Sequence, residues 1–272
     1  MGRLAYSGAT SHVGAIVKNP TAHPDRNGIL NSAWDTMAAD IAAADPDVVV
    51  VIATDHYETF GLEHYPIFCI GSAESLPAWG EFGNPGGSVS GSPATADALH
   101  SHLVRAEFDV ARALEMKLDH SFMVPILRLG LQDRPIVPVF INCNTPPLPS
   151  LHRCRAFGIA LREAISALPA TTSVAVIATG GVSHWVGLPQ FGQINETWDH
   201  EFLRHLESGD IDRILAWTDD EILDKAGNGA LEIRTWLAAQ ACAGGTSAKV
   251  LGYAPMPDWA IGIGVVSMEV SA

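Results

Sequence analysis

Four of the eleven histidines in the sequence stand where side chains often do chemistry. His12, His56 and His184 each follow a predicted strand, and His120 lies in a predicted turn ahead of a helical segment. In open α/β sheets the functional site lies just beyond the carboxyl ends of the strands. Convergent histidines with a carboxylate hold divalent transition metals, and two histidines with one carboxylate are typical of non-haem Fe(II) oxygenases. Because His12 and His56 are 44 positions apart, only the tertiary structure can bring such ligands together.

The other seven histidines lie in predicted helices or polar loops, where a surface or structural role is the simpler interpretation. They are His23, His64, His100, His102, His152, His200 and His205. For any one of the first four, taken alone, a hydrogen-bonded core histidine would also be the simpler interpretation. Taken together the four indicate a site, because none falls in a stretch whose periodicity needs it for packing.

Three continuous apolar runs predict strands that are buried on both faces of a sheet. They cover residues 48–53, 135–141 and 173–178, and a short opening strand is predicted over 3–6. Helical patterns are predicted over residues 30–44, 94–107, 122–131, 151–168, 203–217 and 219–243. The alternation predicts an α/β fold with a mostly parallel central sheet flanked by helices. The Gly/Pro/Ser-rich segment 80–93 is predicted to be a long loop, and such loops are often functional.

The composition, 47% apolar and 17% charged, is that of an ordinary soluble globular protein. A net charge of −14 argues against nucleic acid or an anionic membrane as the partner. No apolar run approaches the roughly 18 residues of a membrane helix, and the N-terminus shows no secretory signal. The four cysteines have no CxxC spacing and are expected to be reduced core residues. We expect a cytoplasmic protein with a single domain over residues 1–272.

The motifs around these histidines resemble those of a known family. In order along the chain they are Thr10-Ser11-His12, Asp55-His56-Tyr57, Phe68-Cys69-Ile70-Gly71, Asp119-His120, Pro138-Val139-Phe140-Ile141-Asn142, Gly180-Gly181-Val182-Ser183-His184, Glu232-Ile233-Arg234-Thr235-Trp236 and Pro257-Asp258-Trp259. The sequence is similar in these blocks to the class III extradiol ring-cleavage dioxygenases, the superfamily of the protocatechuate 4,5-dioxygenase β chain. The blocks cover most of the chain, so the resemblance implies one catalytic domain of that fold.

The resemblance implies that His12, His56 and Glu232 ligate iron(II), which would be the cofactor. Glu232 lies in the otherwise apolar segment ALEIRTWLAAQ, where an unpaired buried carboxylate would be costly and a cation would relieve that cost. A salt bridge from Glu232 to Arg234 or Lys225 is the alternative interpretation.

The resemblance further implies that His120 and His184 are the acid/base pair. A catechol must lose a proton to chelate a metal, and a neutral imidazole near pH 7 is a suitable base. We assign that role to His184, and assign to His120 the orientation of oxygen and the supply of a proton; the two roles can be exchanged or shared. Asp55 and Asp119 either orient the neighbouring histidines or cap the local structure.

The implied reaction opens a catechol-type ring, or a 2-aminophenol, beside the diol with O2 and gives a muconic semialdehyde-type product. The link from His184 to Asn195 departs from the family pattern and is interpreted as a trimmed segment near the site, so the substrate is not carried over from the family. Four cations are candidates for binding a substrate carboxylate, namely Lys18, Arg105, Arg128 and Arg234. Some relatives also need a small α subunit. Seven tryptophans in an acidic, apolar-rich chain favour a homo-oligomer, most simply a homodimer.

Two other functions are compatible with these motifs. The first is a non-oxygenase member of the same fold, such as a metal-poor partner-binding protein. The second is a metallohydrolase, in which one metal activates water. A binding protein has no need of both His120 and His184 beside a complete ligand set, so their joint presence favours ring cleavage.

Overall fold

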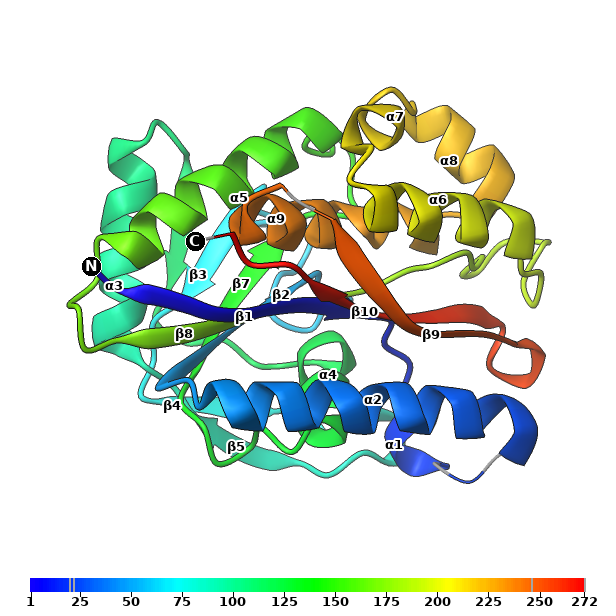
Figure 1. Ribbon diagram of the computed structural model, residues 1–272, viewed down its shortest axis with the longest axis horizontal. Coiled ribbons are helices and arrows are strands. Elements are labelled where there is room, and N and C mark those ends of the chain that lie inside the picture. Colours follow the sequence, from blue (N-terminus) through cyan, green and yellow to red (C-terminus); the bar gives the residue numbers. More distant parts are fainter. Residues whose placement is uncertain (20, 22, 246, 272) are drawn as a thin grey trace.

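The computed structural model describes residues 1–19, 21, 23–245 and 247–271 of the chain. Its centre is an eight-stranded sheet with the order β6-β3-β7-β2-β8-β1-β10-β9 (Figure 1). The strands are β1 Arg3–Thr10, β2 Val48–Ala53, β3 Phe68–Gly71, β6 Val110–Ala113, β7 Ile136–Ile141, β8 Ser173–Thr179, β9 Ala248–Met256 and β10 Ile261–Met268. The central strands β7, β2, β8 and β1 are parallel to one another. At the two ends of this group, β3 runs antiparallel to β7 and β10 runs antiparallel to β1.

The central strands are buried on both faces because helices cover each side of the sheet. Along β2, Val48, Val50 and Ile52 point into one core, whereas Val49 and Val51 point into the other. This alternation follows from the two-residue period of a strand. A run that is apolar at every position is therefore the expected sequence of a strand between two helical layers.

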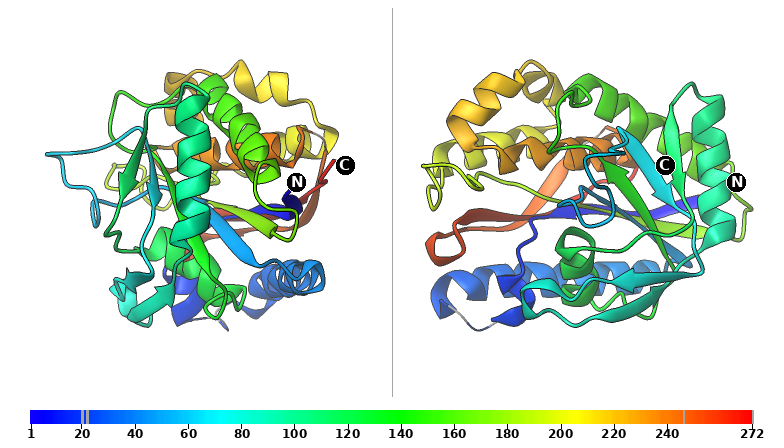
Figure 2. Two further views of the ribbon diagram at one scale, coloured as in Figure 1. Left: turned by 90° about the vertical axis from the view of Figure 1, so that its left-hand side faces the viewer. Right: turned by 180° about the vertical axis from the view of Figure 1, so that it is seen from behind.

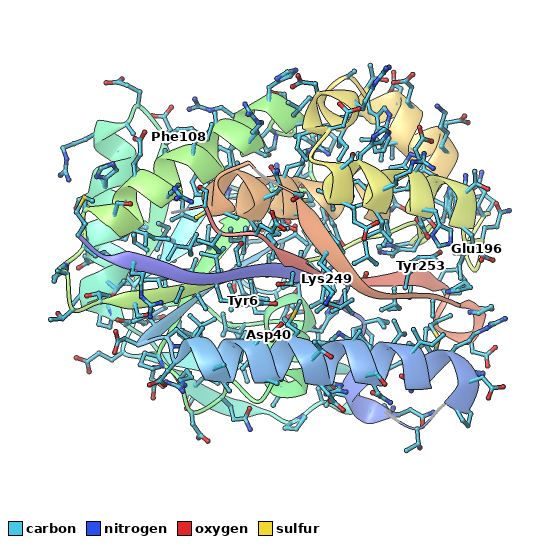
Figure 3. The ribbon with its side chains drawn as sticks, in the orientation of Figure 1. Tyr6, Asp40, Phe108, Glu196, Lys249 and Tyr253 are labelled. Carbon is cyan, nitrogen blue, oxygen red and sulfur yellow. The ribbon has the colours of Figure 1, made fainter. Side chains whose placement is uncertain are left out.

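Figures 1 and 2 show the helices in two layers on opposite sides of the sheet. One layer holds α1 Ala15–Lys18, α2 Pro24–Ala44 and α4 His120–Arg128. The other holds α3 Pro93–Arg105, α5 Leu151–Ser166, α6 Glu196–Ser208, α7 Ile211–Leu215, α8 Asp219–Ala226 and α9 Ile233–Ala243. On the first side Tyr6 of β1 and Asp40 of α2 face each other (Figure 3). The predicted α/β architecture is confirmed.

Several predicted boundaries were wrong, for local reasons. The opening strand extends to Thr10, four residues beyond the prediction, because β1 pairs with β8 and β10 on both sides. The helix predicted over 219–243 is interrupted after α8, where Gly227 has a φ of 91° that a helix does not allow. The short helix η2 Gly229–Glu232 follows before α9.

The predicted loop 80–93 contains regular structure. It begins with the short helix η1 Glu81–Gly83 and then forms β5 Gly87–Ser90, which pairs with β4 Ser75–Ala78 as a small second sheet. The C-terminal hairpin of β9 and β10, with the short helix η3 Pro257–Trp259 at its turn, was not predicted. Glycine and proline interrupt the apolar runs of both hairpin strands and hide the strand pattern. No helix in the described residues is long and apolar enough to cross a membrane.

Candidate active site

The carboxyl ends of three neighbouring strands form the site. β8 lies between β1 and β2 and is parallel to both, so the segments that follow the three strands emerge side by side at one edge of the sheet. His12 follows β1, His56 follows β2 and His184 follows β8. All three side chains, together with His120 from the start of α4, line one cavity of about 680 Å³. The structure thus brings together the four histidines that the sequence analysis selected.

His12 is buried and has one ring nitrogen already occupied. Its Nδ1 lies 2.9 Å from Thr179 Oγ1, and that hydroxyl donates its own hydrogen to the Ser121 carbonyl. The hydroxyl therefore accepts from Nδ1–H, which leaves the Nε2 lone pair of His12 free. Burial lowers the pKa of His12 to about 3, so the imidazole is neutral and suited to bind a metal.

His56 is held by Asp119 from the N-terminus of α4. The Asp119 carboxylate accepts hydrogen bonds from the backbone N–H of His56 at 2.9 Å and from its Nδ1 at 2.7 Å. Burial lowers the pKa of His56, but the carboxylates of Asp119 and Glu232 together outweigh it and raise the pKa above its ordinary value. The Nε2 atom of His56 is directed toward Glu232.

Glu232 is 1% exposed and points between the two histidines. Its Oε1 lies 3.8 Å from His12 Nε2 and 3.4 Å from His56 Nε2, while Oε2 accepts the Gly181 N–H at 2.7 Å. Burial raises the pKa of Glu232, but the two histidines outweigh it and the pKa is lowered. Glu232 is the last residue of η2, so the helical segment predicted around it begins only after it.

The alternative interpretation, a salt bridge from Glu232 to Arg234, is wrong. The guanidinium of Arg234 binds the Asp219 carboxylate and the backbone carbonyls of Pro149 and Leu231. Among the described residues Lys225 forms no ion pair with Glu232 either.

The three converging atoms fit one divalent cation. Imidazole nitrogens and carboxylate oxygens bind such metals at about 2.0 to 2.2 Å, so two atoms that share an ion lie roughly 3 to 4 Å apart. The distances from Glu232 Oε1 to the two histidines are in this range. Glu232 and Asp119 are also two buried carboxylates that share the one imidazole of His56, so a positive charge is missing from their surroundings.

His120 stands against His12 and His56 on the cavity wall. Its ring stacks on His56 with centroids 4.2 Å apart and meets His12 edge-on at 5.2 Å. Nitrogen atoms of His12, His56 and His120 lie within 4.8 Å of one another. The Nδ1 and backbone N–H of His120 both contact the carboxylate of Glu81, which comes from η1. The Glu81 contact was not predicted, because the sequence around Glu81 has no periodicity and the two residues are 39 positions apart.

His184 is positioned by the turn that follows β8. Its Nδ1 lies 3.1 Å from the Val182 carbonyl, and its ring packs against Gly229, where an added Cβ would lie 2.0 Å from Nε2. Burial lowers the pKa of His184, which keeps the imidazole neutral. The preceding Ser183 is fixed by Asp199 of α6, whose carboxylate accepts hydrogen bonds from the Ser183 N–H and hydroxyl.

The two aspartates beside the histidines differ in their contacts. Asp119 binds His56, as described, and also caps α4 by accepting the Ser121 N–H. Asp55 instead accepts the backbone N–H groups of Thr59 and Phe60, both at 3.1 Å, and so closes the turn after β2. Burial raises the pKa of Asp55 to about 6. These contacts favour capping for Asp55 and both roles for Asp119.

The wall and rim of the cavity are mostly apolar. The aromatic side chains of Phe82, Trp185, Phe191 and Trp259 line it, and Lys18 stands at its edge. A second cavity of about 250 Å³ reaches His56 and Glu232 from another side. His56 therefore lines both cavities, whereas His12 lines only the larger one and Glu232 only the smaller one.

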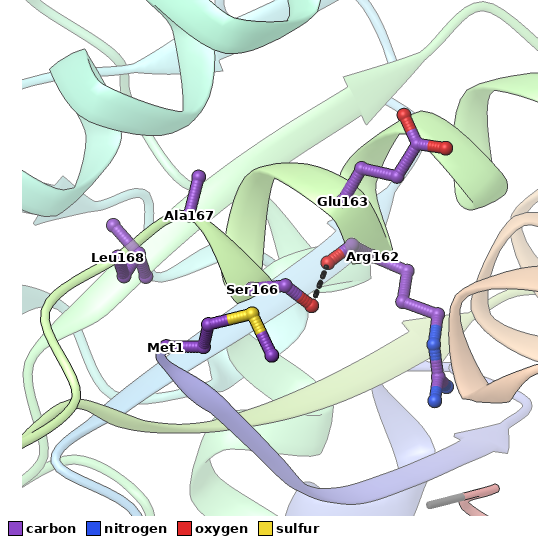
Figure 4. Close-up of a pocket in the computed structure, with 6 residues that line it drawn as sticks. All are labelled: Met1, Arg162, Glu163, Ser166, Ala167 and Leu168. Carbon is purple, nitrogen blue, oxygen red and sulfur yellow. Dashed lines mark hydrogen bonds between the residues drawn. The ribbon is translucent and has the colours of Figure 1, made fainter.

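A hollow elsewhere on the surface lacks such chemistry. It lies beside Met1 and the end of α5, at the amino ends of the strands (Figure 4). Its arginine, Arg162, is occupied by the backbone carbonyls of Cys242, Ala243 and Ser271. The chemistry of the described residues is thus concentrated at the carboxyl ends of the strands.

The fold and the site define an α/β enzyme with a strand-end cavity lined by four histidines, two of which lie beside the buried carboxylate of Glu232. A family model described as the catalytic LigB subunit of aromatic ring-opening dioxygenase matches residues 7–264. The chain belongs to this family, and it is an extradiol-type dioxygenase. This confirms the resemblance drawn from the histidine motifs, and it does not favour the non-oxygenase alternatives.

Individual relatives agree with the family. The chain is 29% identical to a 2,3-dihydroxyphenylpropionate/2,3-dihydroxicinnamic acid 1,2-dioxygenase of Escherichia coli, over 97% of this chain and 98% of that protein. It is 31% identical to the protein of the same name in Paraburkholderia xenovorans, over 81% and 84%. An uncharacterised protein of Escherichia coli K12 shares the fold, with a TM-score of 0.61 and 16% identity over 96% of this chain and 99% of the other.

Proposed function

We propose that the protein is a non-haem Fe(II)-dependent dioxygenase that opens a catechol-type ring, or a 2-aminophenol, beside the diol with O2. The product would be a muconic semialdehyde-type compound. The observation that carries this proposal is the convergence of three atoms: Glu232 Oε1 lies 3.8 Å from His12 Nε2 and 3.4 Å from His56 Nε2. His120 and His184 line the same cavity as His12 and His56.

In this proposal His12, His56 and Glu232 hold the iron. Two imidazoles and one carboxylate would hold the iron and would leave room for two substrate oxygens and O2. The carboxylate supplies the negative charge that a third histidine could not. His120 is not assigned as a ligand because the contact with Glu81 holds it on the wall. The bound iron would supply the oxygen chemistry, and the protein supplies geometry and proton transfer.

His184 is the proposed base. Because burial lowers its pKa, its imidazole is neutral near pH 7 and can accept the proton that a catechol hydroxyl loses on binding. Its position against Gly229 at the cavity wall fixes the ring.

His120 is the proposed partner on the oxygen side. It lies against both His12 and His56, so a group bound between them is within its reach. We assign to it the orientation of O2 and the delivery of a proton as the O–O bond breaks.

The proposed substrate is a catechol with an acidic side chain. The relatives are named for 2,3-dihydroxyphenylpropionate, which carries a carboxylate. Of the four candidate cations, Lys18 lines the cavity, and no ion pair of Lys18 occurs within the described part of the chain. Arg128 pairs with Asp35, and Arg234 is buried with Asp219.

We also propose that residues 1–272 act as one catalytic domain in the cytoplasm, assembled as a homodimer. Exposed apolar side chains near the cavity mouth, among them Phe82, Val186 and Phe191, are compatible with a covering partner, which could also be a small α subunit. Light scattering tests the oligomer, and a monomer at all micromolar concentrations would contradict it.

The central experiment is anaerobic reconstitution with iron(II), followed by a panel of catechols with and without a carboxylate. Yellow ring-fission products and one O2 consumed per ring opened are expected. Zinc and manganese(II) serve as metal controls. Full activity without iron, or no ring opening of any catechol at full iron content, would contradict the proposal.

A further inference from the structure

We propose that Glu81 is the positioning residue of His120: its carboxylate fixes the imidazole so that Nε2 faces the reacting groups. This inference rests on the proposed function of His120, but its geometry can be tested without turnover. It assigns a role to the loop 80–93, in which the sequence analysis named no individual residue.

The contact of the Glu81 carboxylate with His120 is partly buried and uses two N–H groups of His120. Glu81 Oε1 accepts from both the backbone N–H and the Nδ1 of His120. The side chains of Glu81 and His120 are 12% and 13% exposed. A charge-assisted hydrogen bond that is shielded from water is stronger than one on the surface.

The neighbouring aspartate is not available for this task. Asp119 Oδ2 lies 3.9 Å from His120 Nδ1, beyond hydrogen-bond reach, and is occupied by the backbone N–H and Nδ1 of His56. Its other oxygen accepts from Ser121. Each of the two histidines therefore has a carboxylate of its own, and the sequence neighbour of His120 serves His56.

The segment that carries Glu81 is built to approach His120. Phe82 has a φ of 54°, in the left-handed region that a phenylalanine rarely adopts, and glycines 80 and 83 beside it also have positive φ. Backbone in this region is costly for a bulky residue and tends to occur at functional sites. In this conformation the Phe82 ring meets the His120 ring edge-on at 5.2 Å, although Phe82 is 62% exposed.

The chemical consequence concerns the tautomer of His120. A carboxylate only accepts hydrogen bonds, so Nδ1 must carry the hydrogen. The neutral ring then presents the Nε2 lone pair on its opposite side, where it can receive a proton and later return it. Without Glu81 the ring would be free to rotate and to exchange tautomers, and only part of the molecules would have Nε2 correctly placed.

Kinetics of the iron-loaded enzyme give the first test. Glu81→Ala should retain its iron and keep KM for the catechol within about threefold, because the carboxylate of Glu81 binds His120 and none of the three proposed iron ligands, while kcat per iron falls about 10- to 100-fold. Glu81→Gln should recover part of the loss, since its amide oxygen can still accept from Nδ1–H. Glu163→Gln, on the far end of α5, removes the same charge and should behave as the native enzyme.

A double-variant cycle separates positioning from a general structural effect. If Glu81 acts through His120, then Glu81→Ala should cause no further loss in a His120→Ala background. Additive losses, or native kcat in Glu81→Ala, would overturn the proposal.

Nitrogen-15 NMR of the full chain without iron tests the geometry alone. The native protein should show His120 as the Nδ1–H tautomer, and Glu81→Ala should show a mixture with Nε2–H. If ring cleavage failed with every catechol but the tautomer still depended on Glu81, the proposed function would be at fault and the positioning role would stand. The same tautomer in both proteins would overturn the role of Glu81.

Discussion

At the scale of single residues, each carboxylate of the site contacts a different set of histidines. Asp119 reaches His56, Glu81 reaches His120, and Glu232 reaches the space between His12 and His56. In all four histidines of the site it is Nδ1 that makes the hydrogen-bond contact. When Nδ1 of an imidazole is held by a hydrogen bond, Nε2 has one defined role as donor or acceptor. The hydrogen bonds to Nδ1 therefore matter as much as the residues that bind a metal.

The first prediction concerns Glu232. Glu232→Gln keeps an oxygen that can accept the Gly181 N–H but removes the negative charge, so tight iron binding should be lost while the fold survives. Glu232→Ala should lose iron as well and be less stable by about 1 to 3 kcal/mol, because the Gly181 N–H is left without its partner. Metal analysis after gel filtration measures the first effect, and Glu74→Gln is the control. Full iron content in both Glu232 variants would show that Glu232 is not a ligand.

The second prediction separates the two acid/base histidines. His184→Ala and His120→Ala should each bind iron normally, yet turnover per iron should fall by roughly two to four powers of ten. The His184 variant should lose more at low pH, where the catechol keeps its proton and no base takes it. The His120 variant should bind the catechol and consume oxygen without an equivalent amount of ring-opened product. Near-native turnover in both variants would remove the proposed mechanism even if the metal site proved correct.

The third prediction concerns Lys18, at the cavity edge. Lys18→Ala should raise KM for a carboxylated catechol about tenfold and leave KM for unsubstituted catechol unchanged, because only the first has a carboxylate to pair. Steady-state kinetics with the two substrates measure the difference. Equal changes for both substrates would mean that Lys18 does not recognise the acidic group.

Sequence reasoning found the histidines and named Asp119, which holds His56, but it did not find the contact that orients His120. His12, His56 and His184 follow strands whose apolar runs are easy to recognise, so their meeting at one edge of the sheet could be predicted. Glu81 could not, because its contact with His120 spans 39 positions and depends on a loop conformation with positive φ. No local sequence pattern predicts such a contact.

At the scale of elements, the site depends on two short segments that meet. The turn after β8 presents His184, and η2 presents Glu232 immediately before α9. The backbone joins them directly, because His184 N–H donates to the Ala226 carbonyl and Gly229 N–H donates to the His184 carbonyl. The position of His184, the proposed base, is therefore coupled to the segment that carries the Glu232 carboxylate.

The fourth prediction tests this junction. In Gly229→Ala the new Cβ would lie 2.0 Å from His184 Nε2, so the imidazole must move. We expect turnover per iron to fall at least tenfold while the iron content and the fold remain. Gly28→Ala is the matched control, because nothing lies within 4 Å of its added Cβ and it should be neutral or slightly stabilising. Native turnover of Gly229→Ala would show that the His184 ring can shift at no functional cost.

The elements that could be predicted are those with a continuous signal. The strand over residues 48–53 has the predicted bounds, since every position is apolar and buried. The β9–β10 hairpin was missed because residues such as Gly252, Pro255 and Gly264 interrupt its pattern, and its pairing with β1 spans the whole chain. Long-range pairing of this kind leaves no local periodicity.

At the scale of the whole molecule, distant parts of the chain meet under the turn that carries His184. The Asp199 carboxylate of α6 accepts hydrogen bonds from Ser183 after β8 and from Tyr253 of β9, the latter at 2.7 Å. Tyr253 also lies beside Glu196 at the start of α6 (Figure 3). Because this cluster joins three elements, its ionisation acts on the stability of the fold.

The fifth prediction is the pH dependence that follows from Asp199. Burial raises the pKa of Asp199 from 3.8 to about 6, so the folded protein holds this proton over a range in which the unfolded chain has lost it. A group that binds its proton more tightly in the folded state favours folding at low pH, and this contribution is lost as the pH rises from 3.8 to about 6. At about 1.4 kcal/mol per pKa unit, the loss amounts to at most a few kcal/mol.

Asp199→Asn removes the titration and keeps a side chain of the same shape that can still hydrogen-bond to Ser183 and Tyr253. Urea unfolding at pH 4, 5, 6 and 7 measures the free energy of unfolding of both proteins. The value for the native protein should fall relative to that of Asp199→Asn as the pH rises from 4 to about 6, and the difference should change little between pH 6 and 7. Comparison with the variant cancels the contributions of other groups, including His56, whose raised pKa also favours folding at low pH. Asp133→Asn on the surface should follow the native curve. Parallel curves for the native protein and Asp199→Asn would show that the Asp199 cluster does not link protonation to folding.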